Sequence, residues 1–334
     1  MFKKILAATD IVTVRDAPIL SAAKIASENS AQLLILHTLE SAHIHNRNIV
    51  KDFRTWEDTQ HSPEYEQIVR AAIENLYSDI LLYHSGQIEY EIKVVTGFPW
   101  EEILKYARES NPELIVVGPH SKRAEEQGVV RVAGKIGSTV QNIISRERCP
   151  VMIINHEIPS EMVGFKKILV GIDYSVSCEA ALFFATKITK EYGSKVVIFH
   201  MVPVLPYPKY SKENYEIDLK NADKRVREFC EKYLLGIEHE YQIWGGGAAH
   251  VEILKCAEQN TVDLIVMGSH TKSESGKWYA GSAVERVSYR SKCGIMVVTD
   301  PEVIQPWREE GVERNIKDET TTDRFIHVFT KNSE

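Results

Sequence analysis

The chain repeats itself, and this repeat constrains its fold more than any other sequence feature. The segment Phe2–Asp10 (FKKILAATD) returns as Phe165–Asp173 (FKKILVGID), at an offset of 163 residues. Two later matches pair LIVVGPH with LIVMGSH at an offset of 150, and GSTV with GSAV at an offset of 144. Matches that keep their order while the offset shrinks indicate two copies of one domain, with loop insertions in the first copy.

The repeat sets the expected domain organisation of the 334 residues. Domains commonly hold about 100–200 residues, so the length also favours two of them. Eight acidic residues against five basic ones make the end of the chain strongly charged, and this part has no counterpart in the first copy. Its composition predicts a partly disordered extension, although aromatic residues such as Trp307 and Phe325 could dock it on a domain. The expected parts are a first domain over 1–154, a linker over 155–164, a second domain over 165–300 and a charged segment over 301–334.

Within each copy, short apolar segments alternate with amphipathic ones. Lys3–Thr9 and Lys167–Ile172 are typical of buried parallel strands. The strictly alternating segments Ile88–Ile92 and Ile237–Tyr241 are typical of edge strands with one solvated face. The pattern β-α-β-α-β-α-β-α-β predicts the α/β class, with a doubly wound five-stranded parallel sheet in each copy.

Helix ends are signalled by proline and glycine. One helix of the second copy should stop at Gly193, and a longer one should run from Glu213 to Leu235 and close at Gly236. The equivalent long helix of the first copy should begin near Ser62-Pro63.

Composition excludes several classes of protein. A formal charge of −7 argues against nonspecific nucleic-acid binding. The longest apolar run, Ala180–Ala185, is far shorter than the roughly 20 residues of a membrane-spanning helix. Asp10 interrupts the apolar start before it reaches signal-peptide length, so we expect a cytoplasmic protein. The five cysteines form no Cys-x-x-Cys pair, which predicts reduced, mostly buried thiols rather than disulfides or a zinc site.

The predicted topology places a ligand site at the carboxyl ends of the strands, where adjacent loops diverge. Asp10 and Asp173 follow the first strand of each copy, and Asp173 could accept a hydrogen bond from an amino group such as that of adenine. The Gly137-Ser138 and Gly281-Ser282 pairs begin the last helices. A helix start offers unpaired N–H groups and a positive dipole end to a phosphate. These features together indicate a nucleotide site.

Residues 2–300 resemble the universal stress protein family, with two such domains in one chain. ATP-binding members carry Gly, two residues, Gly, nine residues, then Gly and Ser or Thr. The second copy keeps this spacing from Gly268 to Gly281-Ser282 but has Thr271 at the middle glycine. The resemblance implies the strand order 3-2-1-4-5. It also implies that the two copies pair through their last strands with pseudo-two-fold symmetry, and a homodimer of the whole chain stays open.

The resemblance also assigns residues to the site of the second copy. Asp173 and Met201 would lie at its base, while Gly268, Gly281 and Ser282 would meet ribose and phosphates. The expected ligand of the second copy is a small molecule or a nucleotide, with ATP and Mg²⁺ as the candidate cofactor, and the expected role is regulation in a stress response. The full candidate set is Asp173, Met201, Gly268, Ser269, His270, Thr271, Gly281 and Ser282.

The first copy departs further from the family pattern. Pro119 removes an amide donor, and six more residues separate Gly118 from Gly137 than separate the equivalent glycines of the second copy. We therefore expect a degenerate site there, formed by Asp10, Thr38, Gly118, Ser121, Gly137 and Ser138.

The sequence favours a binding protein over an enzyme, because it contains no nucleophile elbow, paired catalytic carboxylates or phosphoryl-transfer loop. No catalytic residue is assigned. One alternative is a weak ATPase or phosphotransferase using Asp173 or His270 with Mg²⁺. Another is a nucleotide-free scaffold whose acidic segment recruits unknown protein partners.

Several histidines and cysteines also have structural interpretations. His43, His45 and His61 lack the spacing of a metal site, and no metal site is assigned. His37 and His200 occupy matching strand ends, where a satisfied structural histidine is favoured over a catalytic one.

Overall fold

The computed structural model divides the chain into two compact units, each considered by itself. The first unit comprises Met1–Ile143 and Val151–Glu161, and the second comprises Ile144–Pro150 and Met162–Glu334. The residues that the structure describes are 1–11, 16–39, 63–83, 88–120, 136–155, 158, 163–204, 211–269, 271–272, 278–279 and 281–299. The charged segment 301–334, whose partial disorder was predicted, lies outside them.

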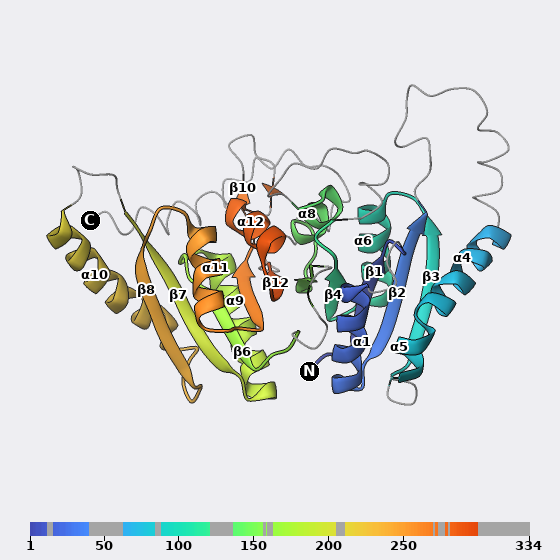
Figure 1. Ribbon diagram of the computed structural model, residues 1–334, viewed down its shortest axis with the longest axis horizontal. Helices are drawn as coiled ribbons and strands as arrows, with labels where there is room; N and C mark the ends of the chain where they lie inside the picture. Colours follow the sequence, from blue (N-terminus) through green and yellow to red (C-terminus); the bar gives the residue numbers. More distant parts are fainter. Residues whose placement is uncertain are drawn as a thin grey trace, which may run out of the picture. The chain divides into compact units, whose positions relative to one another are not determined.

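The first unit contains a five-stranded parallel sheet in the order β3-β2-β1-β4-β5 (Figure 1). Central β1 pairs with two neighbours, so that Ala7 lies between Ile35 and Val116 in register. This confirms the predicted order 3-2-1-4-5. The strands are β1 (Lys4–Thr9), β2 (Gln32–Leu39), β3 (Tyr90–Thr96), β4 (Leu114–Val117) and β5 (Val151–Ile153).

The second unit has the same topology, with the order β8-β7-β6-β9-β12. The edge strands predicted from alternation are confirmed as β3 and β8, although both begin two residues later than expected. The strands are β6 (Lys167–Gly171), β7 (Lys195–Pro203), β8 (His239–Gly246), β9 (Leu264–Gly268) and β12 (Gly294–Val298), together with an antiparallel pair, β10 (Thr271–Lys272) and β11 (Trp278–Tyr279).

Local signals account for most helix boundaries. Ser175 caps the first helix of the second unit by accepting a hydrogen bond from the Cys178 N–H, and Gly193 ends this helix at a φ of 65° as predicted. The predicted start at Pro63 is also confirmed. The helices are α1 (Ala17–Asn29), α4 (Pro63–Leu76), α5 (Ser78–Tyr83), α6 (Pro99–Ser110), α8 (Ser138–Ile144), α9 (Val176–Tyr192), α10 (Lys212–Cys230), α11 (Ala249–Gln259) and α12 (Ser282–Arg290).

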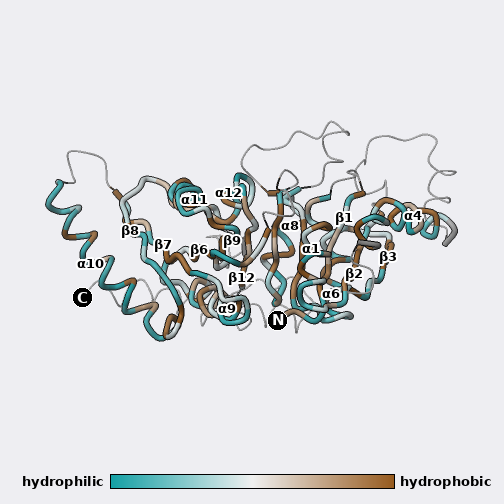
Figure 2. Tube along the Cα trace, turned by 60° about the horizontal axis from the view of Figure 1, so that its bottom comes forward, coloured by the Kyte–Doolittle hydropathy of each residue, from teal (hydrophilic) through white to brown (hydrophobic). Residues whose placement is uncertain are grey.

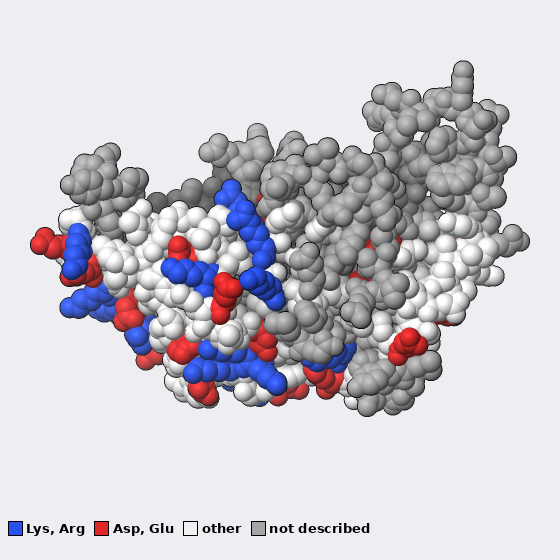
Figure 3. All heavy atoms as spheres, viewed as in Figure 1, with Lys and Arg blue, Asp and Glu red and all other residues white. Residues whose placement is uncertain are grey.

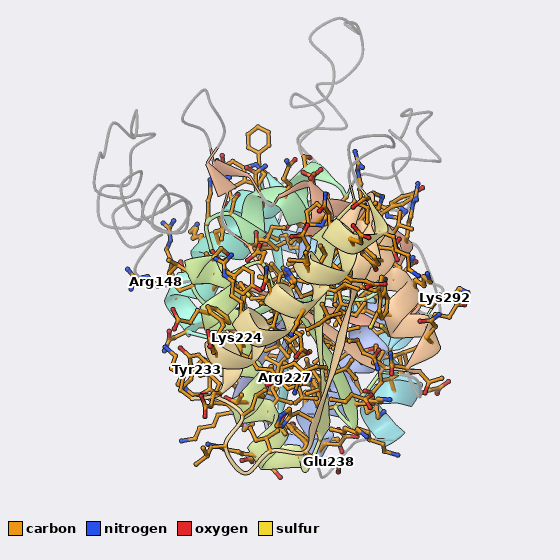
Figure 4. The ribbon with its side chains drawn as sticks, turned by 90° about the vertical axis from the view of Figure 1, so that its left-hand side faces the viewer. Arg148, Lys224, Arg227, Tyr233, Glu238 and Lys292 are labelled. Carbon is orange, nitrogen blue, oxygen red and sulfur yellow. The ribbon has the colours of Figure 1, made fainter. Side chains whose placement is uncertain are left out.

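The predicted end of α10 at Leu235 is wrong, because the helix stops at Cys230. Beyond it, the Tyr233 and Leu234 N–H groups both bond to the Cys230 carbonyl, while Leu235 is 79% exposed. Tyr233 lies on the surface beside α10 (Figure 4) and bonds to Glu179 of α9. This contact holds the chain in a turn, so Gly236, at a φ of 75°, belongs to the following turn rather than to the helix end.

The core of each unit surrounds its central strands. Ile5 and Leu6 of β1 and Leu169 of β6 are fully buried. Figure 2 shows these strands as hydrophobic, whereas α10 is largely hydrophilic. Four of the five cysteines are buried and all five are free, as predicted. Within the described residues, no helix is long and apolar enough to cross a membrane.

Candidate functional site

The parallel sheet of the second unit brings the candidate residues to one edge. Asp173 follows β6, Met201 lies in the last third of β7, and Gly268 ends β9. Helix α12 begins at the same edge with Ser282, because it leads back to the start of the parallel strand β12. The carboxyl edge therefore collects residues that are up to 109 positions apart in the chain.

Asp173 is exposed and oriented by the start of α9. Its Oδ1 accepts hydrogen bonds from the Ser175 N–H at 2.9 Å and from the Ser175 hydroxyl at 2.7 Å. Ser175 in turn caps α9, where the Cys178 N–H donates to its Oγ. Among the described contacts, Oδ2 of Asp173 receives no hydrogen bond and can accept one from a ligand.

The residues that follow Asp10 and Asp173 both adopt a left-handed backbone, which is unfavourable for residues with a Cβ. Ile11 has a φ of 56° and Tyr174 a φ of 66°, exactly 163 residues apart in the repeat. Such conformations cost about 1–2 kcal/mol each and persist only where their surroundings enforce them. The strain is therefore built into the carboxyl edge of both units.

Matching histidines support these strained turns. The Nδ1–H of His37 donates to the Thr9 carbonyl at 2.8 Å, and that of His200 donates to the Ile172 carbonyl at 2.8 Å. Burial lowers the pKa of His200, which favours the neutral ring at pH 7. Both histidines therefore make the backbone hydrogen bond expected of a structural histidine at a strand end.

Tyr174 is held by three side chains of the second unit. Its ring centroid lies 5.0 Å from that of His200 and 5.4 Å from that of Phe229, in an edge-on contact. The Arg225 guanidinium lies over the ring, 4.0 Å from its centroid. Helix α10, which carries Arg225 and Phe229, thereby fixes the turn that presents Asp173.

The start of α12 has the geometry expected of an anion-binding helix terminus. Gly281 has a φ of 88°, which only glycine adopts without strain, and its carbonyl accepts the first helical bond from Glu285. The N–H groups of the first turn have no intrahelical acceptor. Ser282 is exposed beside them. This terminus can therefore present amide donors and a hydroxyl to a phosphate.

Gly268 is explained by packing. A Cβ at this position would overlap the backbone of Ser177 and Cys178 in the first turn of α9. The neighbouring Ser269 is 1% exposed, and its N–H donates to the Val298 carbonyl at 2.9 Å. Both residues join β9 to its neighbours, so their ligand contacts stay a prediction.

The remaining candidates of the second unit belong to other segments of the chain. Met201 is half-buried and pairs with Trp244 of β8. Thr271 belongs to β10 and pairs with Tyr279 of the antiparallel strand β11. His270 lies outside the described residues.

The equivalent edge of the first unit offers fewer donors. The Gly137 N–H, a candidate phosphate ligand, donates to the Pro119 carbonyl at 2.8 Å. Helix α8, which begins at Ser138, is only seven residues long. Asp10 is half-buried after β1, and Thr38 is 8% exposed in β2. Gly118 directly follows β4, and Ser121 lies outside the described residues.

A buried polar network in the first unit was missed by sequence analysis. Asp16, the residue before α1, is 1% exposed, and its Oδ2 accepts hydrogen bonds from Thr9 Oγ1 at 2.8 Å and from the Tyr77 hydroxyl at 2.9 Å. Thr9 Oγ1 and the Tyr77 hydroxyl are also 2.5 Å apart. Burial and then the Asp16 charge raise the pKa of Tyr77 far above its usual value.

The network explains further why the two edges differ. In the second unit, the positions 163 residues after Thr9 and Asp16 are Ile172 and Glu179, and Glu179 bonds to Lys232 on the surface instead. The sequence Asp16-Ala17-Pro18 did signal a helix start. Nothing in the sequence linked it to Tyr77, which lies 61 residues away.

The described residues contain no group of three His, Cys, Asp or Glu side chains that could hold a metal ion. His43, His45 and His61, whose spacing is not that of a metal site, lie outside them.

Comparison with known proteins gives a consistent result. The universal stress protein family model matches twice, over residues 1–155 and 164–299. A universal stress protein of Methanocaldococcus jannaschii is 32% identical over 158 residues, which cover 45% of this chain and 91% of that protein. A second one from the same organism is 28% identical over 158 residues, covering 41% of this chain and 96% of that protein.

Solved structures show the same fold over most of the chain. A universal stress protein from Archaeoglobus fulgidus aligns with a TM-score of 0.57 and 18% identity, covering 89% of this chain and 96% of that chain. A putative universal stress protein from Pseudomonas aeruginosa aligns with a TM-score of 0.59 and 16% identity, covering 92% and 97%. With the family model matching both copies of the repeat, the chain belongs to the universal stress protein family and carries two of its domains in tandem.

Proposed function

We propose that the second unit binds an adenine nucleotide, as ATP with Mg²⁺, and that this binding serves a regulatory role in a stress response. The observation that carries the proposal is that Asp173 and the start of α12, where Gly281 precedes the first turn, both lie at the carboxyl edge of the same sheet. A hydrogen-bond acceptor for the adenine amino group and amide donors for phosphate are both required of such a site. Family membership supports the stress-response role.

The first unit would not contribute a second site. Its Gly137 amide is already hydrogen-bonded, and its edge contains the buried network of Thr9, Asp16 and Tyr77. We therefore propose that one nucleotide binds per chain. The five free cysteines, four of them buried, support a reducing compartment, and we propose the cytoplasm.

The test is a calorimetric titration of the full chain with MgATP, using two matched variants. Gly281→Ala places a Cβ at a φ of 88° and distorts the amides of the first turn of α12. It should weaken ATP binding about fivefold to thirtyfold, the equivalent of 1–2 kcal/mol of backbone strain. Gly137→Ala makes the same chemical change in the first unit, where the added Cβ lies 3.4 Å from its nearest neighbour, and should leave affinity unchanged.

Base preference tests the role of Asp173. The adenine amino group donates a hydrogen bond to a carboxylate, whereas guanine presents a carbonyl at that position, so ATP should bind about tenfold or more tightly than GTP. Asp173→Ala should remove this preference, while Asp10→Ala should retain it. No MgATP binding to the wild-type chain, or equal effects of the two glycine variants, would contradict the proposal.

The same preparation distinguishes binding from turnover. We propose a binding role because the sequence contains no nucleophile elbow, paired catalytic carboxylates or phosphoryl-transfer loop. Phosphate release that continues over many turnovers and disappears in Asp173→Ala would instead support a weak ATPase.

A further inference from the structure

Two arginines on α12 carry positive charge that no acidic side chain pairs with among the residues that the structure describes. Arg286 and Arg290 are both exposed and lie one helical turn apart, on the same face of α12. Neither makes an ion pair with any residue that the structure describes. Like charges at this spacing repel each other by a few tenths of a kcal/mol, so the face is poised for an acidic partner.

Helix α11 places a histidine beside this face. His250 lies in the first turn of α11, which packs against α12, and its pKa is lowered by burial and then by the charges of Arg286 and Arg290. We call Arg286, Arg290 and His250 the arginine face. Figure 3 shows Lys and Arg side chains over α11 and α12, with some Asp and Glu side chains among them.

The acidic residues of α11 are already engaged. Glu252 accepts a hydrogen bond from the Trp244 indole at 2.8 Å and lies 3.7 Å from Lys255. Glu258 pairs with Lys292, which projects from the surface of the second unit (Figure 4), at 2.9 Å. The two carboxylates of α11 are therefore paired elsewhere rather than with the two arginines.

A segment of the same chain has the complementary charge and leaves the fold close by. Helix α12 starts at the carboxyl edge of the sheet, and β12 ends at that edge with Val298. Residues 301–334 carry eight acidic against five basic side chains, including the adjacent pairs Glu309-Glu310 and Asp318-Glu319. Ten extended residues span up to about 33–36 Å, whereas α12 is about 14 Å long, so the first pair can reach the arginines.

We propose that the arginine face is the docking surface for the acidic segment 301–334 of the same chain. The attraction is electrostatic, with Glu309-Glu310 as the nearest acidic pair to the two arginines. Docking offsets the repulsion between Arg286 and Arg290. It also covers part of α12, the helix whose first turn belongs to the proposed nucleotide site.

The experiment is hydrogen exchange of the full chain, read out by mass spectrometry at the peptides that contain residues 302–319. The wild-type segment should exchange slowly at low ionic strength. In Arg286→Glu/Arg290→Glu, exchange should be about threefold to thirtyfold faster, the effect of losing two exposed ion pairs. In the wild type, about 0.5 M salt should produce the same loss, because it shortens the screening length to about 4 Å.

Two further variants make the test specific. Lys187→Glu/Lys190→Glu changes the net charge of the exposed surface of α9 by the same amount and should leave the segment protected. Adding Glu309→Arg/Glu310→Arg to the arginine variant should restore protection, since the attraction is then reversed in sign. Thermal unfolding of each variant checks that the second unit remains folded.

Equal exchange in the wild type and in the arginine variant would overturn the proposal. Equal loss in the α9 control would also overturn it, because the effect would then follow net charge rather than place. Protection that rises with protein concentration would overturn it as well, by showing that the segment docks on a second copy. ATP affinity is not the readout, so failure of the proposed nucleotide site leaves this test intact.

Discussion

Tyr77 stabilises the first unit through a buried hydrogen-bond network. Its hydroxyl is fully enclosed with Asp16 and Thr9, so removing it leaves a buried carboxylate with one donor fewer. Tyr77→Phe should lower the free energy of unfolding by about 1–3 kcal/mol. Tyr106, whose hydroxyl donates to Glu91 at a part-buried site, is the matched control, and Tyr106→Phe should cost less than about 1 kcal/mol. Urea denaturation measures both values, and equal costs would contradict the account.

The same tyrosine predicts a pH dependence. Its pKa in the folded chain is raised above the value of 10.0 in an unfolded chain. Above pH 10 the unfolded state therefore loses this proton while the folded state keeps it, so stability falls as pH rises. Tyr77→Phe should flatten this decline between pH 10 and 11.5, measured as the difference between the two unfolding curves. Parallel wild-type and variant curves would show that Tyr77 does not titrate as described.

The cysteines make a second residue-scale prediction. Burial raises the pKa of Cys230 and of Cys256 to about 12, and that of Cys293 to about 11. Cys178 shifts in the same direction, whereas Cys149 is only half-buried. Thiolate is the reactive form, and burial disfavours it in the other four cysteines. We therefore expect one thiol per native chain, that of Cys149, to react quickly with a disulfide reagent, and Cys149→Ser should remove that reaction. Rapid labelling of two or more native thiols would contradict the prediction.

At the scale of elements, the close approach of β9 to α9 is the contact that most limits substitution. A Cβ at Gly268 would meet the backbone of the first turn of α9, which cannot rotate away as a side chain would. Gly268→Ala should therefore destabilise the second unit by about 1–3 kcal/mol. At Gly247 a Cβ meets nothing within 4 Å, and Gly247→Ala should change stability by less than about 1 kcal/mol. Similar thermal midpoints for the two variants would show that α9 yields to the added methyl group.

Elements were predictable where the signal was local. The stop of α9 at Gly193 and the start of α4 at Pro63 follow from backbone preferences that each residue carries by itself. The end of α10 does not, because the apolar stripe continues to Tyr233 while a contact with Glu179 of α9 turns the chain. Periodicity reports which face is apolar, and it cannot report a hydrogen bond to another helix.

At the scale of the whole chain, the repeat gave the topology of both units and the edge where the candidate site lies. Asp173 and Gly281 could be placed at that edge because parallel strands all end there. The sequence did not reveal that Asp16 and Tyr77 close a polar network in one unit only, since such a network depends on packing between distant segments. The insertions in the first copy show that the two copies have diverged. The hydrogen bonds that distinguish their carboxyl edges can be identified only from the structure.

The central claim is that the two units have diverged into one nucleotide-binding domain and one that does not bind. Native mass spectrometry of the full chain with MgATP measures this directly, because each bound nucleotide adds a fixed mass to the chain. The account predicts one ATP per chain in the wild type and in Gly137→Ala, and a reduced bound fraction in Gly281→Ala. Two ATP per chain, or none at millimolar nucleotide, would contradict it.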